Sequence, residues 1–283
     1  MTNKKVLLAV LAHPDDESFG IGGTLALYAQ RGVAVHLICG TRGEVGEVDA
    51  QLMRGFSSVA ERREFELRCA AEKLGLTQVH FLDYRDSGMP GSPDNQHPKA
   101  LASAHLDEVA EKIATLIRQI KPHVVVTFSP NGGYQHPDHI AIHRATVSAF
   151  SMAEDASFAN GYPSWHPDKL YFSVMPLGWL KLAAKILPLL GRDPRRIGKN
   201  EDIDLIEILE NSDYPIHARI DIHQALAQRE EAALCHSSQL AGAVIRKGPL
   251  RWISMIMPQV DYFMRAYPEV NGKVKEKDLF EGI

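Results

Sequence analysis

Short apolar runs alternate with longer amphipathic stretches along the first half of the chain. The runs have a length typical of buried strands and lie at 6–12, 33–39, 78–82 and 123–129. The stretches carry apolar residues at helical spacing and lie at 22–30, 61–75, 106–120 and 140–150. Strands separated by helices need crossover connections, which give parallel pairing. The pattern therefore predicts an α/β fold, with a Rossmann-like, mostly parallel sheet and helices on both of its faces.

The second half of the chain is less regular. Its predicted elements are two strands, a helix and a polar loop, at 169–175, 217–222, 223–237 and 191–202 in that order. We expect one domain over 1–283, in which 1–150 forms the core. Residues 151–283 then complete the sheet and add helices as an irregular C-terminal extension.

Two further apolar segments, at 175–191 and 251–268, do not fit the alternation. The first is predicted to be an amphipathic helix, since Lys181 and Lys185 stand one turn apart. Neither segment is an uninterrupted apolar run of about 18 residues, so no membrane span is expected. Each can cover a cleft, form a contact in a homo-oligomer or belong to the core, and core packing is the favoured interpretation.

Charge and cysteine content narrow the classes of partner and compartment. The formal net charge is -4, so nothing indicates a nucleic-acid partner. Cys39, Cys69 and Cys235 lie far apart and form no recognisable disulfide framework. This cysteine usage suits a reducing compartment, and we expect a cytoplasmic protein. The apolar stretch near the N-terminus is interpreted as a strand rather than a leader.

The loops that follow the predicted strands are the first place to look for a site. In parallel α/β sheets, ligands bind beyond the carboxyl ends of the strands. Four loops are predicted to share that rim, at 13–23, 40–49, 83–91 and 130–139.

The first rim loop begins with the sequence HPDD at 13–16. His13 and Asp16 are three residues apart across a turn, so their side chains can converge on one point. An imidazole and a carboxylate suit a divalent first-row metal ion. The alternative is helix capping, with Pro14 at the first helical position and acidic side chains favouring the helix N-terminus. By itself, the segment fits either interpretation.

The last rim loop repeats the device in GGYQHPDH at 132–139. Two such turns on one rim bring His13, Asp16 and His139 into a three-ligand set with a fourth position open. That arrangement is typical of catalytic zinc. His143, one helical turn after His139, is an alternative ligand, although this pairing leaves His13 and Asp16 unused.

Other histidines serve as comparisons. A third His-Pro-Asp, at 166–168, is followed by Lys169 and is interpreted as a plain turn. His36 lies within a strand and is interpreted as a satisfied core or sheet residue. His236 adjoins Cys235 and no other ligand type, which favours helix packing.

The rim motifs resemble those of a known family. "AHPDDE" after the first strand, "GTRGE" after the second and "GGYQHPDH" after the fourth are similar to the zinc-dependent de-N-acetylases of the PIG-L / LmbE-like superfamily. The resemblance covers roughly 4–150, with looser similarity in "EAALCHSSQ" at 231–239. The RxxEL pattern that begins at Arg63 and "RDSGM" at 85–89 resemble the deacetylases and amidases of mycothiol and bacillithiol metabolism.

The resemblance implies an α/β fold and hydrolysis of an N-acetyl group from a glucosamine-type sugar. It implies that the metal is held by His13, Asp16 and His139 and that Asp15 is the general base. It also implies that sugar hydroxyls are held by Glu47, Arg63 and Asp86. The polar segment at 191–216 matches nothing in the family and leaves the substrate open.

Hydrolysis of an amide also requires groups that stabilise the oxyanion and protonate the leaving amine. An acetamide is a poor electrophile and water a poor nucleophile, and Zn²⁺ or Fe²⁺ activates both. Tyr134 and His136 are the nearest candidates in sequence for donors to the oxyanion. The leaving amine receives its proton from Asp15 or from His136. Asp138 is interpreted either as a carboxylate that orients an imidazole or as a helix cap.

The expected function is metal-dependent removal of an N-acetyl group from an N-acetylglucosaminyl conjugate, a small-molecule substrate. The nearest alternative is an amidase that cleaves a larger acyl group from a glucosaminyl thiol conjugate. Alternatives of another class are a metal-binding protein without catalysis and a nucleotide-binding module. The second of these lacks GxGxxG and GxxxxGK[ST] and places carboxylates where phosphate would sit.

Overall fold

The computed structural model describes residues 4–197, 204–240, 259–272 and 274–283. In these residues seven strands form one sheet, in the order β3-β2-β1-β4-β5-β7-β6. The strands are β1 (Val6–Leu11), β2 (Ala34–Cys39), β3 (Gln78–Phe81), β4 (Val124–Phe128), β5 (Lys169–Ser173), β6 (Ala218–Asp221) and β7 (Val260–Tyr267). The first five pair in parallel, while β7 is antiparallel to both β5 and β6. The predicted α/β fold with a mostly parallel sheet is confirmed.

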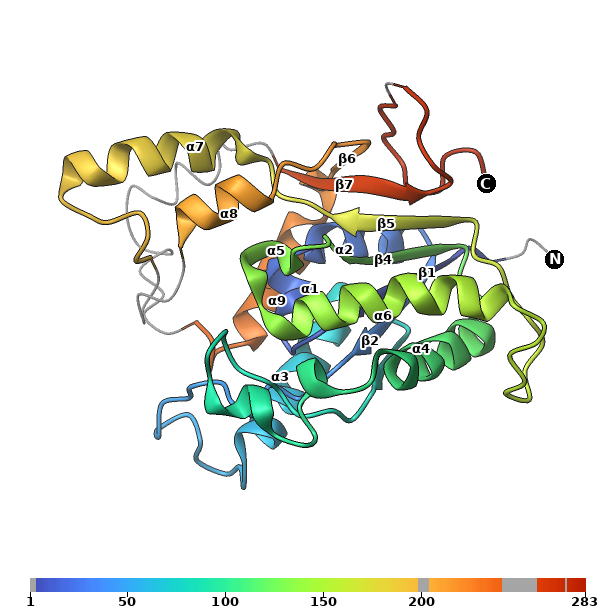
Figure 1. Cartoon of the computed structure of the whole chain (residues 1–283), viewed down its shortest axis with the longest axis horizontal. Coiled ribbons are helices and arrows are strands. Elements are labelled where there is room, and N and C mark those ends of the chain that lie inside the picture. Colours follow the sequence, from blue (N-terminus) through green and yellow to red (C-terminus); the bar gives the residue numbers. More distant parts are fainter. Residues whose placement is uncertain (1–3, 198–203, 241–258, 273) are drawn as a thin grey trace.

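Helices cover both faces of this sheet (Figure 1). One face carries α2 (Gly22–Gln30), α3 (Val59–Leu74) and α9 (Leu226–Cys235), and the other carries α4 (Leu106–Ile120) and α6 (Pro137–Glu154). The two layers explain the unbroken apolar run of β1. Successive strand residues point to opposite faces, and in β1 Leu7 packs into the first layer and Leu8 into the second.

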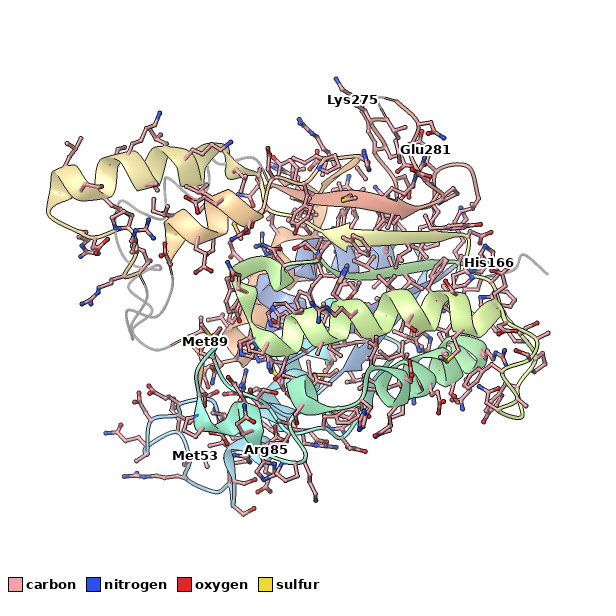
Figure 2. The ribbon with its side chains drawn as sticks, in the orientation of Figure 1. Met53, Arg85, Met89, His166, Lys275 and Glu281 are labelled. Atoms are coloured by element: carbon pink, nitrogen blue, oxygen red, sulfur yellow. A yellow bond between two sulfur atoms is a disulfide. The ribbon has the colours of Figure 1, made fainter. Side chains whose placement is uncertain are left out.

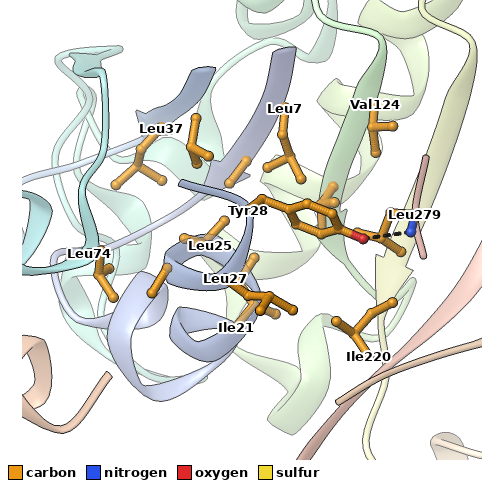
Figure 3. Packing of buried hydrophobic residues seen from close by; sticks show 14 of the residues in the cluster. Leu7, Ile21, Leu25, Leu27, Tyr28, Leu37, Leu74, Val124, Ile220 and Leu279 are labelled. Atoms are coloured by element: carbon orange, nitrogen blue, oxygen red, sulfur yellow. Dashed lines mark hydrogen bonds between the residues drawn. The ribbon is translucent and has the colours of Figure 1, made fainter. Parts of the chain in front are cut away.

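The core beneath α2 ties the C-terminus to the first strand. Leu25 and Tyr28 of α2 pack over Leu7, and the Tyr28 hydroxyl accepts a hydrogen bond from the Leu279 backbone nitrogen at 2.6 Å (Figure 3). Both ends of the chain therefore contribute to one hydrophobic core.

Most predicted helices are present, with shifted ends. The helix expected at 140–150 begins earlier, at Pro137, because proline suits the first helical position, where no backbone donor is needed. The helix expected at 223–237 consists of a 3₁₀ turn, His223–Ala225, followed by α9. Two four-residue helices on the rim, α1 (Asp16–Phe19) and α5 (Gly132–Gln135), were not predicted.

The C-terminal half departs most from the prediction. Strand β7 lies inside the apolar segment 251–268, of which 251–258 fall outside the described residues. It is inserted between β5 and β6, so it pairs on both edges. Part of this segment therefore belongs to the sheet, in agreement with the favoured core interpretation.

The amphipathic segment 175–191 is helical, as predicted. It forms α7 (Leu177–Ile186) and a 3₁₀ turn, Leu187–Leu190. One face of α7 packs against α8 (Leu205–Asn211) in a small cluster formed by Leu177, Leu180, Leu205 and Ile208. The predicted polar loop at 191–202 has no helix or strand in its described part, 191–197.

The interpretation of the cysteines was wrong for two of the three. Cys69 of α3 and Cys235 of α9 form a disulfide, with their Cα atoms 5.8 Å apart. Their separation of 166 residues hid this pairing in the sequence. Cys39 is free and buried. With two cysteines paired, cysteine usage no longer supports a reducing compartment.

The strand order places two distant rim loops side by side. β1 lies between β2 and β4, so the loops after β1 and β4 leave the sheet at neighbouring positions. This is the point at which the strand order reverses, where α/β sheets open a crevice. Within the described residues, no helix is both long and apolar enough to cross a membrane.

Candidate active site

The loops after β1 and β4 meet in a buried cluster of histidines and carboxylates. The second loop depends on Gly132, whose φ is +66°. A Cβ at this position would lie 2.8 Å from the Cβ of His139, so glycine permits the close approach of the turn to the first residues of α6. His139 is thereby turned back toward the loop after β1.

The predicted ligands His13, Asp16 and His139 come together. His13 Nδ1 lies 3.2 Å from His139 Nε2 and 3.6 Å from Asp16 Oδ2, and Asp16 Oδ1 lies 3.3 Å from His139 Nε2. A tetrahedral ion bonded at about 2.0–2.1 Å keeps its ligands about 3.3 Å apart. The distances from His139 Nε2 to His13 Nδ1 and to Asp16 Oδ1 fit such an ion, while Asp16 Oδ2 accepts from the backbone nitrogens of Ala12 and His13.

The outer nitrogens of the two histidines are already committed. His139 Nδ1 donates to the Gly132 carbonyl at 3.1 Å, and His13 Nε2 donates to Asp138 Oδ2 at 3.0 Å. When both rings are neutral, each turns a lone pair toward the other and toward Asp16. A cation between them relieves this juxtaposition, and a hydrogen-bonded outer nitrogen is what metal-binding histidines usually have.

Beside this triangle, two overlapping groups of described residues have ligand atoms close enough to hold a metal ion: His13, His136 and His139, and His13, Asp86, His136 and Asp138. Hydrogen bonding argues against His136 as a ligand, because its Nδ1 accepts from the Asp138 backbone nitrogen at 3.2 Å. A neutral His136 then carries its proton on Nε2. Asp16 completes the set better than His136 does.

Asp138 orients an imidazole, which was one of its two interpretations. It is fully buried, receives His13 Nε2 on Oδ2, and is held by the backbone nitrogen of Ser87 at 2.9 Å and by the Ser87 hydroxyl. The ring that it orients is His13. The helix cap is supplied instead by His136, at the start of α6.

Asp15 lies beside the cluster without joining it. Its backbone has φ 127° and ψ −28°, a conformation that L-residues rarely adopt and that costs about 1–3 kcal/mol. Its Oδ2 accepts from Arg63 Nη2 at 3.1 Å. Burial raises the pKa of Asp15 from its ordinary 3.8 to about 6; Arg63 opposes this shift and Asp16 adds to it. A carboxylate with that pKa suits proton transfer near neutral pH.

His136 and Tyr134 flank the same cluster. Burial lowers the pKa of His136 to about 3, and the neighbouring His13 and His139 contribute, so this ring is neutral at pH 7. Tyr134 is partly exposed and lies edge-on to His139, with ring centroids 5.0 Å apart. Burial of its hydroxyl raises the pKa of Tyr134. Both side chains therefore carry a proton that they can donate.

The three predicted substrate contacts occupy different environments. Asp86 is buried within the cluster, with Oδ1 3.5 Å from His13 Nε2. Arg63 is buried and donates to the carbonyls of Pro14 and Gly43 as well as to Asp15. Glu47 is exposed on the loop after β2. Asp86 and Arg63 therefore contact residues of the cluster, whereas Glu47 is exposed on its loop.

The rival and comparison histidines lie outside the ligand set. His143 donates from Nδ1 to the Phe128 carbonyl at 2.8 Å and packs edge-on against Phe172. His166 lies just before β5, at the amino ends of the parallel strands and therefore opposite the rim. Figure 2 shows it far from Met89 of the rim loop. It pairs with Glu154 at 2.9 Å. The interpretation of 166–168 as a plain turn agrees with this position.

Three residues near the site were missed as contributors: Glu17, Ser87 and His236. His236 Nε2 contacts Glu17 Oε1 at 2.6 Å, and both side chains are completely buried. The interpretation of His236 as helix packing was therefore incomplete. Its signal was present in "EAALCHSSQ", but nothing local in the sequence connects that segment with the loop after β1.

Comparisons with solved structures show the fold. The N,N'-diacetylchitobiose deacetylase of Pyrococcus horikoshii matches with a TM-score of 0.63 and 20% identity, covering 93% of this chain and 84% of that one. The 4-carboxy-2-hydroxymuconate hydratase of Pseudomonas putida matches with a TM-score of 0.62 and 21% identity, over 95% and 99%. Fold and cluster together define an α/β protein with a candidate metal centre at the carboxyl ends of its strands.

Sequence comparison then identifies the family. The PIG-L family, described as GlcNAc-PI de-N-acetylase, matches residues 8–150. The 1D-myo-inositol 2-acetamido-2-deoxy-alpha-D-glucopyranoside deacetylase of Acidothermus cellulolyticus is 36% identical over 294 residues, 98% of this chain and 94% of the relative. The chain belongs to the PIG-L family of de-N-acetylases. The expectation of a deacetylase, a hydrolase acting on an amide bond, is confirmed.

Proposed function

We propose that this protein removes the N-acetyl group from an N-acetylglucosaminyl conjugate of myo-inositol, using Zn²⁺ held by His13, Asp16 and His139. The substrate class is supported by the name of the 36% identical relative, which is a deacetylase of such a glycoside. Two imidazole nitrogens and a carboxylate suit zinc, and they also suit Fe²⁺.

One observation carries this proposal. The ring nitrogens of His13 and His139 face each other at 3.2 Å with their outer nitrogens already hydrogen-bonded, and a carboxylate completes the triangle. Asp15, with its raised pKa, lies directly next to this set along the chain. A ligand set with a proton acceptor at its side is the arrangement required for metal-assisted amide hydrolysis.

The residues around the ligand set divide the proton transfers. When bound, the metal supplies Lewis acidity to the amide carbonyl and to water. Asp15 accepts the proton of the attacking water. His136, neutral and protonated on Nε2, donates a hydrogen bond to the developing oxyanion, and the Tyr134 hydroxyl assists it. Because the pKa of His136 is too low for an imidazolium at neutral pH, Asp15 returns its proton to the leaving amine.

Sugar recognition falls to the rim. Glu47 is exposed and able to accept hydrogen bonds from sugar hydroxyls. Asp86 is proposed to reach the substrate from the floor of the site, next to His13. The main proposed role of Arg63 is to hold the Asp15 carboxylate. A hydrogen bond from Arg63 to the sugar would be donated by the same guanidinium group. We further propose one domain over 1–283 and a cytoplasmic location; the location follows from the class of small-molecule substrate, since the paired Cys69 and Cys235 do not support it.

The test is reconstitution with a matched substrate panel. Protein stripped of metal and reloaded with one equivalent of zinc or ferrous iron is assayed for free amine from N-acetylglucosaminyl-inositol. The panel adds N-acetylglucosamine alone and a glucosaminyl conjugate with a larger acyl group. Release of acetate from the inositol conjugate at the highest kcat/KM supports the proposal. Faster release of the larger acid indicates the amidase instead, and no release with either metal overturns the catalytic assignment.

A further inference from the structure

The backbone of Asp15 is held in its unfavourable conformation by one side chain in particular. The Asp15 backbone nitrogen donates to Glu17 Oε2 at 2.9 Å. The Asp15 carbonyl oxygen accepts from Ser18 and Phe19, at 3.0 and 2.9 Å, within the first turn of α1. A residue with φ 127° persists only where its surroundings over-determine its position, so these contacts are needed to keep Asp15 beside the ligand set.

Glu17 in turn is held from the far end of the sequence. Its carboxylate is completely buried and accepts from the Ser18 hydroxyl at 2.5 Å on Oε1. The same oxygen contacts His236 Nε2 at 2.6 Å, across 219 residues of sequence. A buried carboxylate needs such partners, because removing a charge from water is costly unless it is hydrogen-bonded. His236 holds Oε1 of this carboxylate, and the other oxygen, Oε2, accepts from the Asp15 nitrogen. By fixing the orientation of the carboxylate, His236 keeps Oε2 in place for Asp15.

The hydrogen bonding assigns the tautomer of His236. Its Nδ1 is buried and has no hydrogen-bond partner among the residues that the structure describes. A proton on Nδ1 would be a buried donor without an acceptor, whereas an unprotonated Nδ1 leaves only an unused lone pair. A proton on Nε2 is therefore favoured, and Glu17 stabilises it: burial lowers the pKa of His236, but the adjacent carboxylate outweighs burial and raises the pKa above its ordinary value. In this form His236 is a donor aimed at Glu17.

His236 is fixed by contacts of its neighbours with α3. Cys235 is tied to Cys69 by the disulfide. Ser238 donates from its backbone nitrogen to Glu66 Oε1 at 2.9 Å and from its hydroxyl to Glu66 Oε2 at 2.5 Å. Helix α3 also carries Arg63, which holds the Asp15 carboxylate. The segment 235–238 and the Asp15 side chain thus share one rigid support.

We propose that Glu17 and His236 form a buried positioning pair, which holds the backbone of Asp15 where its carboxylate serves the reaction. The contacts described for this pair lead to Asp15, Ser18 and each other, so each residue acts through Asp15. The proposal rests on the proposed deacetylase function and adds to it a C-terminal residue that the motifs on the rim do not contain.

The test exploits the reach of two amides. In His236→Gln the side-chain nitrogen can occupy the position of Nε2, whereas in His236→Asn it can occupy only that of Nδ1. Zinc-loaded wild type, both variants and Glu17→Ala are compared in kcat, KM, metal content and melting temperature. We expect His236→Asn and Glu17→Ala to lower kcat about 10-fold to 100-fold, with KM changed less than about 3-fold and one metal per chain retained. His236→Gln should recover to within about 5-fold of wild type.

A second readout does not depend on activity. Amide hydrogen exchange of the peptide containing 15–19 should be at least about 10-fold faster in His236→Asn than in wild type, and close to wild type in His236→Gln. Tyr171→Phe is the matched control. It removes a buried hydrogen bond, 2.8 Å long, from Tyr171 of β5 to Glu276 of the C-terminal segment. Figure 2 labels Lys275 and Glu281 of the same segment. This control should leave kcat and this exchange rate unchanged.

Equal kcat and equal exchange rates in His236→Asn and His236→Gln would overturn the positioning pair. So would a loss of activity that is proportional to the loss of melting temperature in every variant, the control included. An inactive wild type with normal exchange differences would instead contradict the proposed function and leave the positioning pair standing. The two failures are therefore distinguishable.

Discussion

The tripeptide His-Pro-Asp occurs at 13–15, 136–138 and 166–168, and the three copies behave differently. The first two follow β1 and β4, at the carboxyl ends of adjacent strands, and their side chains meet in the buried cluster. The third comes before β5, at the other edge of the sheet. There His166 is exposed and pairs with Glu154 and with the Tyr267 hydroxyl.

The difference shows that the tripeptide by itself forms only a turn. It contributes to a candidate metal site where it follows one of two adjacent parallel strands. In each copy proline restricts the backbone and the flanking polar side chains can approach each other. At the reversal of the strand order, two turns face each other and supply imidazoles and carboxylates to one volume. At the opposite edge a single turn faces solvent. Variants that act on one copy at a time test this comparison.

The largest effect is expected from His139→Ala. It removes one of the two nitrogens that face the ligand position, so metal content should fall below about 0.1 per chain and activity should fall to background. Metal analysis after dialysis checks this. His143→Ala, one helical turn further along α6, is the control and should retain its metal, because His143 is bonded to the Phe128 carbonyl. Metal loss in the control alone would make His143 the ligand.

Asp15→Asn should keep the metal and lose the reaction. The amide cannot accept the proton of water, and general-base catalysis is worth about 10²–10⁴-fold in rate, so kcat should fall by that amount. Steady-state kinetics on the zinc-loaded protein measures it. Asp168→Asn makes the same change in the third copy of the tripeptide and should leave kcat unchanged. Full activity of Asp15→Asn would contradict the general-base role and favour the alternative interpretation of 13–16 as a helix cap.

The raised pKa of Asp15 predicts a pH-dependent stability in the metal-free protein. Its pKa is about 6 when folded and 3.8 ordinarily, so the folded state binds the proton more tightly. The stabilisation is complete below about pH 4 and is lost as pH rises through 6. The free energy of unfolding should fall by about 2–3 kcal/mol over this range relative to Asp15→Asn. Urea unfolding at several pH values tests this, and parallel pH profiles for the two proteins would contradict it.

Asp138→Asn should weaken metal binding without abolishing it. The carboxylate holds the Nε2–H of His13, and loss of such an outer hydrogen bond costs about 10–100-fold in metal affinity. Competition with a chelator of known affinity measures the change. Ser87→Ala removes one support of the same carboxylate, so its effect should be smaller and of the same sign. Unchanged affinity in Asp138→Asn would reduce Asp138 to packing.

His166→Ala should have the smallest effect. It breaks a pair with Glu154 on the surface, and exposed pairs contribute at most about 1 kcal/mol. Metal content and kcat should stay within about 2-fold of wild type, as checked beside His139→Ala in the same preparations. A marked loss of metal here would contradict the distinction between the rim copies and the third copy.

Local pattern was enough to predict the sheet of the first half. Periodicity distinguishes a buried run such as 6–12 from a helix such as 106–120, because each depends on neighbours a few residues away. For the same reason the helix ends were less well predicted: the start of α6 depends on His136 and Pro137, whose side chains also belong to a site. Strand β7 was missed, because its two partners are distant in sequence.

The sequence by itself also determined which residue types stand at the carboxyl ends of β1 and β4, and the spacing within the two motifs was enough to predict that His13, Asp16 and His139 converge. Only the tertiary structure decided which nitrogens point inward and that Asp138 orients His13. It alone joins His236 to Glu17, across 219 residues. Contacts of this kind depend on strand order and on the packing of α9 against α3, and neither leaves a periodic signal in the chain.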